Sequence, residues 1–179
     1  MRKAIVAFLL FLFCLPLFSK GPKIEDIYYS FDNQHLYVSV SLQKGFLTQE
    51  VLDALDSTKP TTFTYEIEVA KSRLLWYDKT THRVVVKKTF TYDNLTHQYE
   101  LSVIKNDEPA EKKSLTSIDE VEKEISRLDD LDAGSIADLM PGENLYYIRV
   151  RVTLLKSYFL WLFPADVDTG WKEKALKTP

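Results

Sequence analysis

Residues 146–154 read Tyr-Tyr-Ile-Arg-Val-Arg-Val-Thr-Leu, and this stretch decides the fold class. Apolar and polar side chains alternate in it, which is typical of a β-strand with one face in a core and the other in water. Five more stretches alternate in the same way, at residues 27–31, 36–42, 63–69, 84–92 and 97–103. None of them is followed by the regular crossover helix that parallel strands require. The sequence therefore predicts a mostly antiparallel β-sheet or sandwich of about six strands.

The alternation also assigns a face to each side chain. In the last stretch Val150 points into the core and Arg149 into water. We therefore expect aspartate to abolish folding at position 150 and to cost little at position 149. His97 begins the fifth stretch on its inward face. Lys88 is the one misfit, because it falls on the apolar face of the fourth stretch.

Two amphipathic helices are predicted between the strands, which makes the fold class α+β. Thr48 is placed to cap a short helix that carries Val51, Leu52 and Leu55 on one face. A second helix begins with the capping box formed by Ser117 and Glu120. Its apolar stripe consists of Ile118, Val121, Ile125 and Leu128, and Gly134 is placed to end it. Residues 105–113 are predicted to form a polar loop, and residues 140–144 a turn before the last strand.

Composition indicates one globular domain and excludes general nucleic-acid binding. The chain has 179 residues, of which 45% are apolar and 13% aromatic, enough to form a core. Its formal net charge is −3. Loss of Arg2 and Lys3 with a signal peptide would make it −5, because both lost charges are positive. A mildly acidic chain does not attract nucleic acid.

The first nineteen residues have the pattern of a secretory signal peptide. Arg2 and Lys3 precede an apolar run at residues 4–13, and Ser19 offers a small residue at which cleavage is expected. The domain organisation is therefore predicted as a signal peptide at 1–19 and a single exported domain at 20–179, on the far side of a membrane. The alternative is an uncleaved anchor at residues 4–18, which is shorter than the roughly 20 residues that span a bilayer.

The sequence indicates no metal, cofactor or disulfide chemistry. His35, His82 and His97 are too scattered for a zinc site. The one cysteine, Cys14, falls in the signal segment. The acidic runs at residues 129–134 and 166–170 lack the glycine and distal glutamate of a calcium loop, so we interpret them as solvated loop acids.

Charged and aromatic surface residues are the remaining candidates for binding. The outward basic residues pair with Glu66 and Glu68 across the sheet or else form a basic stripe; they are Arg83, Lys87, Arg149, Arg151 and Lys156. Trp161 lies in the apolar run at residues 158–164, which closes the core or presents a patch to a partner. Trp76 lies in the connection between the third and fourth stretches.

Two motifs carry a family resemblance. Residues 73–78 read Arg-Leu-Leu-Trp-Tyr-Asp, and residues 91–99 read Thr-Tyr-Asp-Asn-Leu-Thr-His-Gln-Tyr. With the second helix and the closing strand, they resemble a family of exported bacterial proteins known as domain of unknown function four thousand three hundred and ninety. The likeness covers about residues 27–152. It implies that residues 20–179 form an envelope domain, in the periplasm or on the outer face of the inner membrane. From gene neighbours in some relatives, it also implies an accessory or sensing role beside a membrane sensor kinase. It implies no activity.

The resemblance and the residues together predict a non-enzymatic envelope protein that binds another protein or an envelope component. The candidate binding residues are Arg73, Trp76, Asp78, Tyr92, Asp93, Gln98 and Trp161. Asp93 also suits a hairpin turn, and Arg73 and Asp78 suit an ion pair across the strand connection. Two alternatives stay open: a hydrolase that uses scattered aspartates and histidines, and a small carrier of an apolar ligand inside a curled sheet. The expected partner is an envelope protein or a membrane-associated protein.

Overall fold

The computed structural model describes residues 22–73, 77–139, 146–155, 158–159, 163–164 and 167–177. Five features predicted from the sequence lie outside these ranges: the signal peptide at 1–19, Trp76, the turn at 140–144, the outward basic residue Lys156 and Trp161. None of the helices in the described ranges is long and apolar enough to cross a membrane.

The larger of the two main sheets is antiparallel throughout and has the strand order β11-β8-β3-β4-β5-β6, with β12 also paired to β8. Its strands are β3 (Thr61–Lys71), β4 (Lys79–Asp93), β5 (Gln98–Lys105), β6 (Glu108–Leu115), β8 (Tyr146–Leu155), β11 (Val167–Asp168) and β12 (Lys172–Ala175). The smaller sheet has the order β1-β2-β7, from β1 (Ile24–Asp32), β2 (His35–Leu42) and β7 (Arg127–Ser135). The short strands β9 (Tyr158–Phe159) and β10 (Phe163–Pro164) pair with each other.

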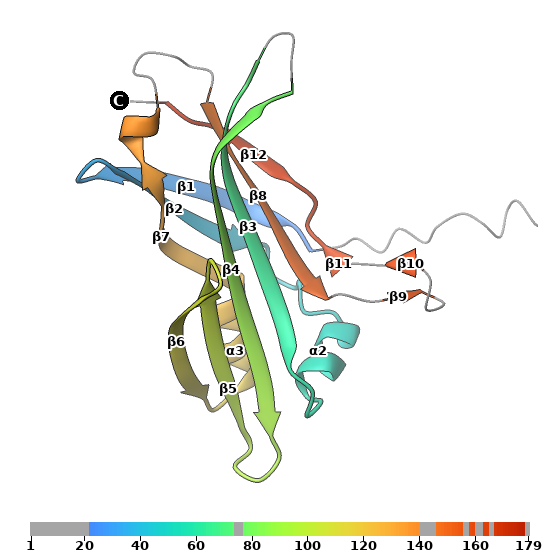
Figure 1. The fold of residues 1–179 in the computed structure, drawn as a ribbon. Coiled ribbons are helices and arrows are strands. Elements are labelled where there is room, and N and C mark those ends of the chain that lie inside the picture. Colours follow the sequence, from blue (N-terminus) through green and yellow to red (C-terminus); the bar gives the residue numbers. More distant parts are fainter. Residues whose placement is uncertain are drawn as a thin grey trace, which may run out of the picture.

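Two short helices join the sheets around one core. They are α2 (Gln49–Leu55) and α3 (Ile118–Ser126), and a single 3₁₀ turn, η1 (Ile136–Asp138), follows β7. Figure 1 shows the smaller sheet and α3 on the same side of the large sheet. The inward side chains of both sheets and both helices form one apolar cluster. The predicted class, an α+β fold with a mostly antiparallel sandwich and two helices, is thus confirmed.

The region after Ser126 differs from the prediction. The capping box is present, since Ser117 Oγ accepts the N–H of Glu120 at 3.3 Å. However, α3 ends at Ser126, and Leu128 and Gly134 lie in β7. Gly134 has φ +123°, and an added Cβ would lie 2.6 Å from the ring of His82. Glycine is required there by close packing between β7 and β4, not by a helix end.

Three smaller expectations are also corrected. The predicted polar loop at 105–113 is a tight turn at Asn106 and Asp107 followed by strand β6. His97 does not point inward; it is an exposed turn residue with φ 54°. Thr48 is the N-cap of α2, but its side chain makes no capping hydrogen bond.

The misfit Lys88 has a structural explanation. Its side chain is only 6% exposed. Its ammonium donates to the carbonyl oxygens of Glu124 at 2.6 Å and Arg127 at 2.8 Å. The hydroxyl of Tyr65 donates to the carbonyl of Ile125, the residue after Glu124. The ring of Tyr65 lies 5.4 Å from Lys88 Nζ. The last carbonyls of a helix have no partner within the helix, so these two side chains of the large sheet fix the C-terminal end of α3.

The outward charges of the large sheet pair with each other, as the sequence indicated. Arg83 Nη2 lies 3.0 Å from Glu66 Oε1, and Arg151 bonds the same carboxylate. Arg149 lies 2.5 Å from Glu68, which is only 6% exposed. Lys87 instead pairs with Asp107. The expectation that Arg149→Asp costs little is therefore revised, because the new carboxylate would face a buried one.

The Glu66 carboxylate makes the stability of the fold depend on pH in the acidic range. Burial raises its pKa, but hydrogen bonds and the charges of Arg151 and Arg83 outweigh burial and hold the pKa below its ordinary value of 4.5. A carboxylate with a lowered folded-state pKa stabilises the fold above its unfolded pKa, and this contribution is lost as the pH falls through the folded value. We expect the free energy of unfolding in urea to fall below pH 4.5, and to fall less in Glu66→Gln. Glu100→Gln, on an exposed residue of the same face, is the control and should follow the parent; parallel pH curves for Glu66→Gln and the parent would contradict this account.

Candidate functional site

The candidate residues predicted from the sequence fall at opposite ends of β4. Arg73 and Asp78 flank its beginning, while Tyr92, Asp93 and Gln98 surround its end. Because a strand rises about 3.3 Å per residue, the fifteen residues of β4 separate the two groups by roughly 46 Å. The structure therefore does not bring these residues together into one site.

At the beginning of β4, Asp78 organises the connection from β3. Its Oδ1 accepts the backbone N–H of Arg73 at 3.1 Å, and its Oδ2 accepts the hydroxyl of Tyr147 at 2.6 Å. The hydrogen bond from Tyr147 is the main reason that the pKa of Asp78 lies below its ordinary value. Burial, and then the bond to Asp78, raises the pKa of Tyr147 to about 12. Asp78 thus contacts Arg73 through the main chain, and the predicted ion pair is not formed.

At the end of β4, Asp93 forms the predicted turn. Its carboxylate accepts the N–H of Leu95 at 2.8 Å and the hydroxyl of Thr96 at 2.9 Å. The hydroxyl of Tyr92 lies 3.1 Å from His97 Nδ1. Gln98 is half-buried opposite Asp93 on β5. These contacts give the motif at 91–99 a structural role as an ordered hairpin turn.

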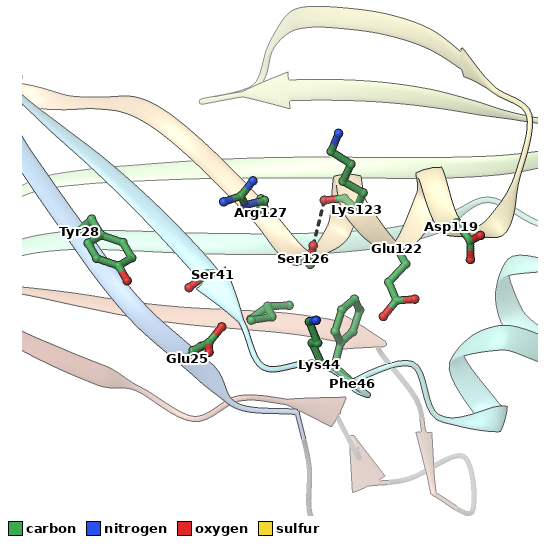
Figure 2. Close-up of a pocket in the computed structure, with 11 residues that line it drawn as sticks. Glu25, Tyr28, Ser41, Lys44, Phe46, Asp119, Glu122, Lys123, Ser126 and Arg127 are labelled. Atoms are coloured by element: carbon green, nitrogen blue, oxygen red, sulfur yellow. Dashed lines mark hydrogen bonds between the residues drawn. The ribbon is translucent and has the colours of Figure 1, made fainter.

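A concave surface lies elsewhere, between α3 and the ends of β1 and β2. We name it the α3 groove (Figure 2); its volume is about 670 Å³. It is lined by Glu25, Tyr28, Ser41, Leu42, Lys44, Phe46, Asp119, Glu122, Lys123, Ser126 and Arg127.

The floor of the α3 groove is apolar and one end is aromatic. Leu42 and Phe46 are each 3% exposed and belong to the core. Tyr28 is 58% exposed, and Lys174 Nζ lies 5.2 Å from the centre of its ring. Figure 2 shows Tyr28 at one end and Asp119 with Glu122 at the other, with Lys44 and Phe46 between them. A ligand in the groove would thus meet apolar surface below and polar groups on the walls.

The walls carry six charged side chains, three acidic and three basic: Glu25, Asp119, Glu122, Lys44, Lys123 and Arg127. Within the described part of the chain, none of the six forms an ion pair. The contrast with the outer face of the large sheet is sharp, because Glu66, Glu68 and their arginines all pair there. Six charges of both signs around an apolar floor therefore remain available to a ligand.

Local structure holds the groove in place. Glu120 accepts the N–H of Thr116 at 2.7 Å and anchors the first turn of α3. Ser126 Oγ donates to the carbonyl of Lys123 at 3.0 Å near the last turn. With Lys88 and Tyr65 at the C-terminal end, both ends of this wall are fixed by hydrogen bonds. Sequence reasoning missed the groove, since its residues range from position 25 to position 127 and share no motif.

Neither the groove nor the other described residues hold a cluster of three or more His, Cys, Asp or Glu side chains able to bind a metal ion. The two runs of aspartates have other roles. Asp132 Oδ1 accepts the N–H of Gly134 at 3.0 Å and lies close to His35, and Asp168 accepts the N–H of Gly170 at 2.7 Å. The expectation of solvated loop acids is wrong for residues 129–134, which lie in strand β7, where Asp132 pairs with His35.

The fold and the groove define a class: an α+β sandwich domain with a mixed-charge surface groove. Comparison with known families gives the particular assignment. Residues 19–158 match the family model described as domain of unknown function, DUF4390, and the chain belongs to this family. No curated protein and no solved structure matches the chain. The match ends before β11 and β12, so these two strands lie outside the matched range.

Proposed function

We propose that this chain is an exported, non-enzymatic module of the bacterial envelope that binds another envelope protein through the α3 groove. The observation that carries the proposal is the set of six charged groove side chains that form no ion pair among the described residues. Charges that a domain leaves unpaired in a concavity provide specificity for a partner of complementary charge.

Export is supported by the sequence. The basic start, the apolar run at residues 4–13 and Ser19 form the pattern of a signal peptide. The resemblance to exported bacterial proteins supports the same location. The accessory role that it implies makes the external part of a membrane sensor kinase the first partner to test.

A binding role is also supported by the chemistry of the groove. The groove has two serines, Ser41 and Ser126, and the hydroxyl of Ser126 donates its proton to a main-chain carbonyl. A nucleophilic serine would instead be hydrogen bonded to a base. No histidine or cysteine is among the groove-lining residues. These side chains suit recognition better than hydrolysis.

The test is photo-crosslinking in the native host from a benzoylphenylalanine at Ser41. We expect an envelope protein to be captured, and the yield to fall about tenfold in Lys44→Glu/Glu122→Lys, because a lost charge contact at an interface costs roughly 1.4 kcal/mol or more. The mass of the recovered chain is also measured by mass spectrometry. If export removes the signal peptide, we expect an N-terminus near Lys20.

The matched control is Lys87→Glu/Asp107→Lys, which inverts an ion pair far from the groove without changing the net charge. It should capture as much partner as the parent chain. If both double variants capture equally, the groove is not the binding site. An intact Met1 would show instead that residues 4–18 remain as an anchor.

A further inference from the structure

The charges along α3 are spaced regularly. Asp119, Lys123 and Arg127 follow one another at intervals of four residues, with Arg127 directly after the helix. For Asp119 and Lys123 this interval is about 6 Å along the helix axis, and residues four apart share one face. Arg127 has extended backbone (φ −133°, ψ 142°) and begins β7. The groove lining thus has one negative and one positive charge on α3, and a second positive charge at the start of β7.

The opposite groove residues reinforce this order. Figure 2 shows Glu122 near Asp119 at the acidic end, and Lys44 on the opposite wall at the centre. Glu25 lies across from Arg127 and is the one acid at the other end. From Asp119 toward Tyr28, the groove is thus negative at Asp119, positive at Lys44, and positive again at Arg127, where Glu25 is the acid on the opposite wall.

The helix dipole explains only part of the arrangement. It favours an acid such as Asp119 in the first turn of α3 and a base in the last. It does not explain Lys44, which lies outside the helix. Nor does it explain why Asp119 and Lys123, which have the favourable spacing for an ion pair within a helix, form none among the described contacts.

We infer that the α3 groove binds an extended peptide segment of its partner, with a basic, an acidic and a second acidic side chain at alternate positions from the Asp119 end toward Arg127. Alternate side chains of an extended chain share one face and lie about 6.6 Å apart, close to the spacing on α3. The exposed ring of Tyr28 offers the apolar surface for an apolar side chain of the same segment, since Leu42 and Phe46 are almost fully buried. The inference rests on the proposed function and names its partner chemistry.

The experiment uses dodecapeptides displayed on phage, selected against the whole domain. We expect enriched peptides to carry the basic, acidic, acidic pattern at alternate positions. A synthetic copy should bind at least about tenfold more tightly than a scrambled peptide with the same charges at consecutive positions. In Asp119→Lys/Arg127→Glu the central lysines are unchanged, so selection should enrich the reversed order, which is acidic, acidic and basic from the same end. If that variant fails to fold, Asp119→Asn/Arg127→Gln replaces it, because it keeps a polar first turn of α3. This second variant should lose binding to the original peptide.

The inference is overturned if no peptide is enriched, if enriched peptides lack the pattern, or if they bind the folded variants as well as the parent. The proposed function has a separate outcome. Crosslinking that depends on the groove, without peptide enrichment, would keep the groove as a binding site but exclude an extended peptide as its ligand. Crosslinking that does not depend on the groove would reject the proposed function itself.

Discussion

Val150→Asp is expected to leave the chain unfolded at neutral pH. Val150 is fully buried, and it lies between Ile67 of β3 and Lys172 of β12 in the sheet register. An aspartate there would place a carboxylate among apolar side chains without a partner. The cost of burying an unpaired charge is comparable with the roughly 5–15 kcal/mol that stabilises a whole domain. Far-UV and near-UV circular dichroism should both lose the native signal.

Val85→Asp is the matched control, because it makes the same change on the outer face of the sheet. Val85 is half-buried on β4, and Arg83 and Lys87 lie two residues away on the same face. Glu66 lies opposite Val85 in the sheet register, so the new carboxylate costs some stability, but the positive charges of Arg83 and Lys87 limit that cost. We therefore expect a folded protein with a melting temperature below that of the parent. If Val150→Asp were as stable as Val85→Asp, the assignment of the two faces of the large sheet would be wrong.

The alternation of apolar and polar residues predicted β8 correctly but missed β6, and both outcomes have the same physical basis. β8 has a buried face and an outward face, so its sequence alternates. β6 is an edge strand, and seven of its eight residues are exposed. A strand with water on both faces has no reason to alternate, and Glu108–Leu115 therefore resembled a polar loop.

β7 was missed for a different reason. Its register with β2 shifts between Val38 and Val40, which pair with Leu131 and Leu128. The extra residue of this bulge places the two leucines three positions apart. Apolar residues three positions apart are also typical of one face of a helix. The sequence pattern therefore predicted that the helix continues to Leu128, where the structure has a strand. Asp130, with φ 47°, lies within the same bulge.

The α3 groove could not be predicted from sequence, because no local pattern joins its walls. Glu25 and Lys44 come from the first hairpin and its exit, while Asp119 comes from α3 and Arg127 from the start of β7, well over seventy residues later. Only the packing of α3 behind the large sheet brings them together. Two sequence signals were related to that packing: the apolar stripe of the helix, and Lys88, which was visible only as a polar residue on an apolar face.

Lys88→Met is the second change with a large expected effect, and it tests that packing. Methionine keeps the length and apolar contacts of the side chain but removes both hydrogen bonds to the carbonyls of Glu124 and Arg127. Burial lowers the pKa of Lys88, so part of the loss is offset by no longer burying an ammonium. Two carbonyls left without donors cost more than this relief. We expect a net loss of about 2–3 kcal/mol in urea unfolding.

Tyr65→Phe is the comparison, because it removes one neutral hydrogen bond at the same helix end and should cost about 1–2 kcal/mol. Hydrogen exchange separates a local from a global effect. If Lys88 fixes α3, the amides of Val121 and Ile125 should exchange faster in Lys88→Met than those of Ile67 and Val150 in the large sheet. Partner capture through the groove should fall in the same variant, since α3 forms one wall of it. A Lys88→Met protein that is more stable than the parent would mean that the buried ammonium costs more than its hydrogen bonds return, and that apolar packing alone holds α3 in place.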